Sequence, residues 1–320
     1  VSGLSSEDRN TIGIYPLKGK LLNVRGEQVK KVNDNKEISD IKKVLGLETG
    51  KENNTLDDVY KYLRYGKILI LCDQDTDGSH IKGLCINLFH SEWSSLVQIK
   101  GFLSYMNTPI LRAKKGNEKK LFYNDGEYNE WKTSIGGDTK GWNIKYFKGL
   151  GTSTTKEAKE YFKELHNTRI NYGYDEPECF KLAFEKSRAD DRKEWLMNYD
   201  RELILDQKAT KVSCQDFFNK DFIHFSNYDC ERSIPSMIDG LKISQRKVLF
   251  SVLKRNLTKE IKVAQLSGYV SETSCYHHGE QSLNDCIVSM AQNFVGSNNI
   301  NLLEPIGQFG TRLQGGKDSA

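Results

Sequence analysis

A short apolar run that ends in three alternating aspartates constrains this chain more than any other feature. The run KILILC, residues 67–72, is continuous and rich in β-favouring residues, which is typical of a strand buried on both faces. An apolar stripe at helical spacing follows over residues 81–89. A strand that gives way to a helix predicts an α/β unit with a parallel sheet. Asp73, Asp75 and Asp77 would then lie at the carboxyl end of a strand, where such sheets collect ligands.

The spacing of the three acids also predicts their chemistry. Residues two apart share one face of an extended strand, so Asp73, Asp75 and Asp77 can converge on one point. Carboxylates brought that close repel one another, and a divalent cation removes the repulsion. Mg²⁺ is typically held by one or two carboxylates together with water and phosphate oxygens. We therefore predict that these three aspartates are metal ligands.

Two other interpretations of the acidic run remain open at this point. The pattern DxDxDG also begins the calcium loop of an EF-hand, but the twelfth position is Leu84, where a bidentate Glu is needed, and a strand is expected in front of it. The simpler alternative is an exposed acidic turn before a helix whose N-cap is Ser79, since acids near a helix start are stabilising.

Composition restricts the class of protein. The chain has 320 residues, enough for two or three domains, and begins at Val1 rather than Met, so we expect a segment of a longer protein. Its longest apolar run, Ile68–Cys72, is too short to span a bilayer, so no membrane partner is expected. Seven cysteines occur singly and without a CxxC pair, which favours reduced thiols over a zinc site. The net charge of +4 leaves nucleic-acid binding to local basic clusters.

Helical patterns and a change in charge divide the chain into three regions. A capping box, Thr154 with Glu157, opens a helix near the end of the first region, residues 1–165. Residues 166–205 are so highly charged that a solvated helical connector is expected. The third region, 206–320, has short helical patterns with many basic residues, compatible with a winged-helix module. Further helices are expected at residues 38–45, 56–63, 248–253, 261–266 and 283–290.

Six motifs occur in a fixed order along the chain. They are YPLKGKLLNVR (15–25), DQDTDGSHIKGL (73–84), YFKGLGTST (146–154), PSMIDGLKISQRKVL (235–249), YHHGEQSL (276–283) and GQFGTRLQGGKDSA (307–320). Together they resemble the DNA-cleavage core of type IIA DNA topoisomerases of the eukaryotic kind. The first three are similar to the Toprim domain, and the last three to the winged-helix domain. The resemblance implies an α/β Toprim domain, with a mostly parallel sheet flanked by helices, followed by a mainly helical winged-helix domain.

The resemblance implies a reaction and its partners. In this family, an ATP-dependent isomerase cuts double-stranded DNA transiently through a 5′-phosphotyrosyl link, passes a second duplex through the break and reseals it. Mg²⁺ supports cleavage, with Mn²⁺ or Ca²⁺ as possible substitutes, and ATP binds on a domain outside this chain. The full protein would be a homodimer. It would lie in the nucleus of a cellular eukaryote, or in the host cytoplasm or nucleus if it came from a large DNA virus.

The resemblance also assigns roles to individual residues. Asp73, Asp75 and Asp77 match the family's DxDxD motif, with Asp75 and Asp77 as the stronger metal-ligand pair. The residues implied in catalysis are Lys148, Arg246, His277 and His278. The residues implied in DNA binding are Lys18, Lys20, Arg25, Lys242, Lys247, Gln308, Arg312 and Lys317. Taken without the resemblance, the basic positions are equally compatible with surface turns and solvated helix faces.

The resemblance places two functional groups outside this sequence. The nucleophilic Tyr is expected after Ala320, and the first acid of the Toprim motif before Val1. Tyr269 and Tyr276 are therefore expected to be packing residues, and these 320 residues alone are expected not to cleave DNA. One alternative is a non-catalytic DNA-binding homologue. The other is a Toprim nuclease or primase, and the downstream histidine and glycine motifs argue against this second one.

Overall fold

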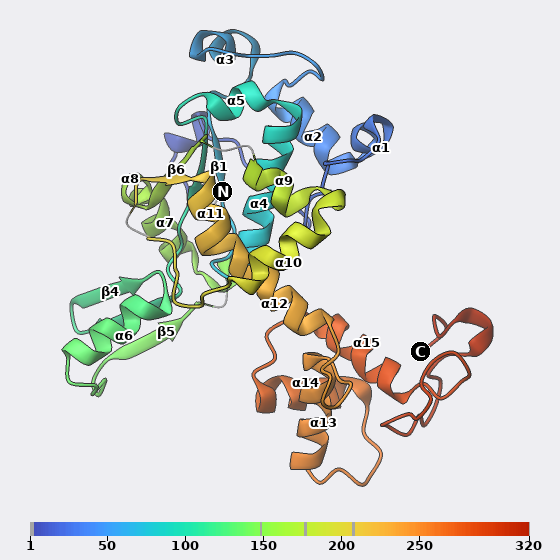
Figure 1. Ribbon diagram of the computed structural model, residues 1–320. Helices are drawn as coiled ribbons and strands as arrows, with labels where there is room; N and C mark the ends of the chain where they lie inside the picture. Colours follow the sequence, from blue (N-terminus) through green and yellow to red (C-terminus); the bar gives the residue numbers. More distant parts are fainter. Residues whose placement is uncertain (1–2, 148, 176–177, 207–208, 320) are drawn as a thin grey trace. The chain divides into compact units, whose positions relative to one another are not determined.

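The computed structural model describes residues 3–147, 149–175, 178–206 and 209–319 (Figure 1). The chain forms two compact units, residues 1–227 and residues 228–320. Each unit is built around its own hydrophobic core, and each is described here by itself.

A mixed sheet forms the centre of the first unit. Within the described residues it has four strands in the order β1 (Ile68–Ile70), β2 (Leu103–Met106), β6 (Arg169–Gly173) and β7 (Lys211–Ser213). β1 pairs parallel with β2, β2 antiparallel with β6, and β6 parallel with β7. The α/β class is confirmed, and the sheet combines two parallel pairings with one antiparallel pairing.

Helix α4 (Thr76–Glu92) is the most deeply buried helix of this unit. Residues 82–90 are buried without interruption, as expected for a helix that is covered on all sides by its neighbours. Aromatic side chains cover part of it, and Gly83 lets them approach, since a Cβ there would lie 2.5 Å from the Phe222 ring. The described helices of the N-terminal half of this unit are η1 (Asp8–Asn10), α1 (Val29–Asp34), α2 (Lys36–Leu45), α3 (Leu56–Tyr62) and α5 (Ser94–Gln98).

A second sheet is formed by strands that come between β2 and β6 in the sequence, and it is entirely antiparallel. Its strands in the described part of the chain lie in the order β4 (Glu118–Phe122), β3 (Leu111–Lys115) and β5 (Asn143–Tyr146). Helix α6 (Asp125–Ser134) lies along this sheet (Figure 1), and Trp131 packs with apolar side chains of β3 and β4 in a small separate core. After β5 the chain passes through the short turn η2 (Leu150–Thr152) into α7 (Thr155–Lys163).

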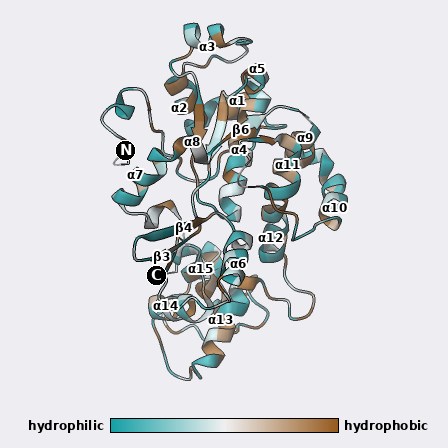
Figure 2. Cartoon of the chain, turned by 90° about the vertical axis from the view of Figure 1, so that its left-hand side faces the viewer, coloured by the Kyte–Doolittle hydropathy of each residue, from teal (hydrophilic) through white to brown (hydrophobic). Residues whose placement is uncertain are grey.

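Residues 166–205, expected to form a solvated connector, contribute to the first unit's core. β6 lies inside the main sheet, and Phe180 of α9 (Glu178–Phe184) is fully buried. The expected solvation holds for α10 (Ala189–Met197), whose charged run 190–194 is hydrophilic in Figure 2 and has no buried residue. The remaining helices of this half are α8 (Leu165–Thr168), η3 (Lys186–Arg188), α11 (Cys214–Phe217) and the π-helical turn Phe218–Phe222.

The second unit is mainly helical, as predicted. Helix α12 (Ile223–Ser233) leads into it, followed by α13 (Ile243–Lys254), α14 (Val263–Ser274), α15 (Glu280–Ala291) and η5 (Arg312–Gln314). Val248, Leu266, Val270, Leu283 and Ile287 form its core. Among its described residues, strand pairing is limited to one bridge between Phe309 and Ser319.

The compact units divide between Asn227 and Tyr228, whereas the expected regions divide near residues 165 and 205. How the family's domains are bounded along this chain therefore stays a prediction. No helix in the described ranges is long and apolar enough to cross a membrane. All seven cysteines are free thiols.

Candidate functional site

The acidic run forms the junction between β1 and α4, as the sequence predicts. Asp75 is the N-cap of α4, and its Oδ1 accepts a hydrogen bond of 2.7 Å from the backbone N–H of Gly78. The alternative in which Ser79 is the N-cap of this helix is wrong, because Ser79 lies inside the first turns of α4 and is buried. The calcium-loop alternative is also wrong, since α4 begins at Thr76, within the twelve residues that an EF-hand keeps as a loop.

Asp73 faces the loop that follows β5. Its Oδ1 accepts a hydrogen bond of 2.7 Å from the backbone N–H of Leu150. Gly149 brings this loop close, because a Cβ at that position would lie 2.6 Å from Oδ2 of Asp73. Gly78 allows an even closer approach to the backbone of Asp73, since a Cβ there would lie 1.9 Å from the carbonyl oxygen of Asp73. Two glycines therefore fix the surroundings of this one aspartate.

Asp77 pairs with a predicted DNA-binding residue. Its Oδ1 lies 2.8 Å from the Nζ of Lys20, whose ammonium also lies 4.8 Å from the centre of the Phe225 ring. The YPLKGK motif and the acidic motif, 57 residues apart, thus meet in the fold. Lys18 of the same motif is exposed.

The three carboxylates suit a hard cation by chemistry, since Mg²⁺ prefers oxygen ligands and uses one or two carboxylates. They do not form a closed three-carboxylate cage. In the described parts of the chain, no group of three or more His, Cys, Asp and Glu is arranged to hold a metal ion. Each aspartate instead has its own partner: Leu150 for Asp73, Gly78 for Asp75 and Lys20 for Asp77. The fit to Mg²⁺ therefore rests on donor chemistry and on position at the strand end.

Arg25, predicted to face phosphate, makes its contacts at the other end of α4. Its Nε donates to Oδ1 of Asn87 at 2.6 Å, and its Nη2 lies 2.6 Å from Nδ1 of His90. Asn87 is ten residues beyond Asp77, or about 15 Å along a helix axis. Burial, together with the nearby Arg25 charge, lowers the pKa of His90 to about 4. The Arg25 guanidinium therefore binds the C-terminal part of α4. A role of Arg25 in phosphate binding stays a prediction.

A buried ion pair beneath the acidic junction was not expected from the sequence. Lys82 is only 2% exposed, and its Nζ lies 2.8 Å from Oδ2 of Asp221 in the π-helical turn. Ser79 donates to the other oxygen of Asp221 at 2.5 Å. Burial lowers the pKa of Lys82, but the Asp221 carboxylate outweighs it, so the pKa is raised and the ammonium stays charged. The sequence signal is the pair Ser79 and Lys82, three residues apart on a helix with an apolar surface.

In the second unit, Arg246 forms a two-pronged ion pair. Its Nε lies 2.7 Å from Oδ2 of Asp239, and its Nη2 lies 2.8 Å from Oδ1. Nη2 also donates to the carbonyl of Leu241 at 3.1 Å. The hydrogen bonds from Arg246 lower the pKa of Asp239, so this carboxylate is ionised. The guanidinium is therefore held in one orientation at the start of α13.

The two predicted histidines lie side by side between α14 and α15. Their ring centres are 4.5 Å apart. Nε2 of His278 lies 2.8 Å from the hydroxyl of Tyr228 on α12, while His277 is exposed. Tyr276 is buried against this core, as its predicted packing role requires. The geometry orients His278 and leaves His277 accessible.

The remaining predicted DNA-binding residues lie at the surface of the same unit. Lys242 precedes α13, and its backbone N–H donates to the side chain of Gln245. Lys247 donates to the carbonyl of Cys275 at 3.4 Å. Gln308, Arg312 and Lys317 belong to a C-terminal loop that is closed by hydrogen bonds from Thr311 to Asp318. Lys148 lies outside the described residues.

Comparisons with known proteins agree with this arrangement. Residues 106–230 match the family model "C-terminal associated domain of TOPRIM", and residues 232–320 match the family model of DNA gyrase and topoisomerase IV, built on their A subunits. Human DNA topoisomerase 2-alpha is 52% identical over 335 residues, covering all of this chain and 22% of that protein. Mouse DNA topoisomerase 2-beta is 53% identical and is covered to 21%.

A solved structure shows the same fold. The Plasmodium falciparum topoisomerase II DNA-binding, cleavage and re-ligation domain matches with a TM-score of 0.80 and 50% identity, over 96% of this chain and 42% of that one. An α/β unit followed by a mainly helical unit is thus the architecture of a type II topoisomerase cleavage domain. The chain belongs to the family of type IIA DNA topoisomerases, and to the eukaryotic kind within it. It spans about a fifth of the length of the curated relatives that it matches.

Proposed function

We propose that this chain is part of the machinery with which a type II DNA topoisomerase, an isomerase, cleaves and re-ligates double-stranded DNA. The observation that carries the proposal is the likeness of 96% of the chain, at 50% identity, to a domain named for DNA binding, cleavage and re-ligation. The reaction would proceed through a 5′-phosphotyrosyl link whose Tyr lies outside these residues. ATP use, homodimer formation and a nuclear location belong to the same proposal for the full protein.

Asp73, Asp75 and Asp77 would hold Mg²⁺ at the end of β1, with Mn²⁺ or Ca²⁺ as substitutes. When bound, such an ion supplies charge stabilisation to phosphate oxygens. The chain's own contacts prepare the three carboxylates. Asp75 is fixed as a helix cap, Asp73 is oriented by the Leu150 N–H, and Asp77 is partly neutralised by Lys20.

The basic residues would bind the DNA backbone. Lys20 adds positive charge beside Asp77, where a phosphate would otherwise be repelled, and the exposed Lys18 of the same motif would add to it. In the second unit, His277, His278 and Arg246 would contact the phosphate that is cut, with His278 oriented by Tyr228 and Arg246 by Asp239. Lys242, Lys247, Gln308, Arg312 and Lys317 would bind neighbouring phosphates, and Lys148 would act in cleavage.

The substitution Asp75→Asn tests the metal role without destroying the helix cap. Asn is as good an N-cap as Asp and can accept the same Gly78 hydrogen bond, but it carries no charge. In the full-length protein, we expect Mg²⁺-dependent formation of the covalent protein–DNA adduct to be abolished, while the Tm and duplex affinity stay unchanged. Asp57→Asn, at an exposed position of α3, is the control. Full adduct formation by Asp75→Asn would contradict the metal assignment. Wild-type protein that forms no adduct would contradict the proposed function itself.

A further inference from the structure

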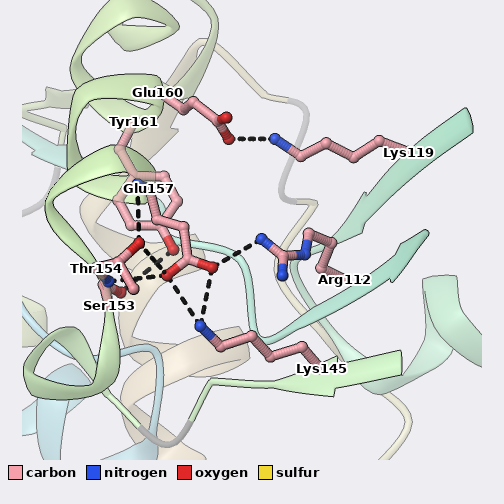
Figure 3. Close-up of polar contacts among 8 residues, drawn as sticks. All are labelled: Arg112, Lys119, Lys145, Ser153, Thr154, Glu157, Glu160 and Tyr161. Carbon is pink, nitrogen blue, oxygen red and sulfur yellow. Dashed lines mark hydrogen bonds and ion pairs between the residues drawn. The ribbon is translucent and has the colours of Figure 1, made fainter. Parts of the chain in front are cut away.

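A buried carboxylate on α7 joins two parts of the first unit. Glu157 is 6% exposed, and its Oε1 accepts hydrogen bonds from Arg112 at 2.7 Å and Lys145 at 2.8 Å (Figure 3). Its Oε2 accepts from the backbone N–H of Thr154 at 2.8 Å and from Lys145 at 2.9 Å. Two cations of the antiparallel sheet and the N-cap of α7 therefore share one acid.

The register of the antiparallel sheet makes this acid necessary. Arg112 of β3 lies directly opposite Lys145 of β5. Like charges at directly opposed positions repel, so the pair requires a compensating anion. Glu157 supplies it. Glu160, one turn further along α7, pairs with Lys119 at the sheet's other edge (Figure 3), but its side chain is 40% exposed, against 8% for Glu157.

The same cluster holds both ends of the loop that faces Asp73. On the N-terminal side, the ammonium of Lys145 lies 4.8 Å and the guanidinium of Arg112 5.7 Å from the centre of the buried Phe147 ring. On the C-terminal side, Glu157 accepts from Thr154. Between these ends lies Leu150, whose N–H donates to Asp73.

The contact with Asp73 is sensitive to the position of this loop. A Cβ on Gly149 would lie 2.6 Å from the Asp73 carboxylate, so the backbone already approaches at close range. Small movement of the loop would lengthen the 2.7 Å hydrogen bond from Leu150 and free the carboxylate to turn. The orientation of Asp73 therefore depends on what anchors the two ends of the loop.

We propose that Glu157 is a positioning residue that, through Arg112, Lys145 and Thr154, holds the 149–153 loop against Asp73. This inference deepens the proposed function and rests on it, since Asp73 is there assigned to the metal site. Glu157 touches neither DNA nor metal in this proposal. It acts through the loop, as groups outside a metal site orient its ligands.

Two variants on α7 separate this role from general stabilisation. Glu157→Gln removes the buried charge at nearly constant volume, and Glu160→Gln removes the partly exposed charge from the same helix. In the full-length protein, we expect Glu157→Gln to need about tenfold more Mg²⁺ for half-maximal DNA cleavage. Its affinity for duplex DNA without metal should not change. Glu160→Gln should behave as wild type, because exposed ion pairs contribute little.

Hydrogen–deuterium exchange gives a readout that does not depend on activity. We expect faster exchange in peptides covering residues 149–154 of Glu157→Gln, and no effect of Glu160→Gln. Wild-type protein without Mg²⁺-dependent cleavage would refute the proposed function, while the exchange result still tests the anchoring. Equal Mg²⁺ requirements in both variants, or equal exchange over 149–154, would refute the positioning role.

A second variant covers the case in which Glu157→Gln does not fold. Lys145→Met weakens the cluster from the sheet side while it leaves the Glu157–Arg112 pair in place. The same direction of change is expected, with faster exchange over residues 149–154 and a raised Mg²⁺ requirement. A folded Lys145→Met protein with wild-type values for both measurements would also overturn the proposal.

Discussion

In the first unit, two ion pairs near the acidic junction are buried or nearly so, whereas in the second unit the predicted DNA-facing cations lie at or near the surface. Lys82, Asp221 and Glu157 are buried or nearly so. Lys242 and His277 are exposed, and Arg246 is paired with a partly exposed Asp239. The first unit is therefore organised before any ligand arrives. The second presents positive charge at its surface, where an anion from outside can reach it.

This difference predicts that substitutions will separate into two classes. Changes at the buried charges of the first unit should lower stability and activity together, because a buried charge left without its partner is costly. Changes in the second unit should weaken DNA binding with little effect on stability.

The largest effect is expected at the buried ion pair of the first unit. Lys82→Met leaves the Asp221 carboxylate without its ammonium, so the free energy of unfolding should fall by about 3 kcal/mol. Urea unfolding followed by circular dichroism measures it. Lys186→Met, which breaks an exposed pair with Glu27, is the control and should have almost no effect. Equal losses in the two variants would remove the distinction between buried and exposed charge.

A smaller effect is expected from pH at Glu157. Burial alone would raise the pKa of this carboxyl, but hydrogen bonds from Lys145 and Thr154 lower it to about 2, below its ordinary 4.5. The folded state thus favours the ionised form, so its stabilisation is complete above the ordinary pKa and is lost as the pH falls from 4.5 toward 2. Over this range, the stability advantage of wild type over Glu157→Gln should shrink by about 2 kcal/mol. A constant difference across acid unfolding curves would contradict it.

The smallest effect on stability is expected in the second unit. Lys247→Met should leave the free energy of unfolding within about 0.5 kcal/mol of wild type. It should reduce the slope of log affinity against log salt for duplex DNA by about 1, since one phosphate contact is lost. Fluorescence anisotropy across a salt series measures this slope. Lys254→Met, on the same helix at an exposed position, should keep the wild-type slope. Identical slopes for both variants would remove Lys247 from the DNA-facing surface.

Features encoded by neighbouring residues could be predicted from the sequence. The β1–α4 junction, the Thr154–Glu157 capping box and α13, α14 and α15 all follow from periodicity and cap chemistry. The N-cap of α4 was missed because Asp75 and Ser79 are both good capping residues, and only the backbone path decides between them.

Features that depend on distant residues could not be predicted. Asp221 lies 139 positions from Lys82, and Arg112 lies 45 from Glu157. Neither pair leaves a local pattern. The charge of residues 166–205 also hid β6, because the strand's neighbours in the sheet, not its own composition, place it in the core. For the candidate site, the sequence and its resemblance to a known family pointed to Asp73, Asp75 and Asp77. The structure added the hydrogen bonds and the ion pair that hold each of these aspartates.

The two glycines around Asp73 have a consequence for how this chain can vary. At position 78 an added methyl would overlap the main chain, and at position 149 it would overlap a carboxylate. Neither glycine carries a group that could take part in chemistry, yet even alanine should be rejected at both places in a screen for working variants. At positions 78 and 149, the range of allowed residues is therefore limited by the space that Asp73 needs around it.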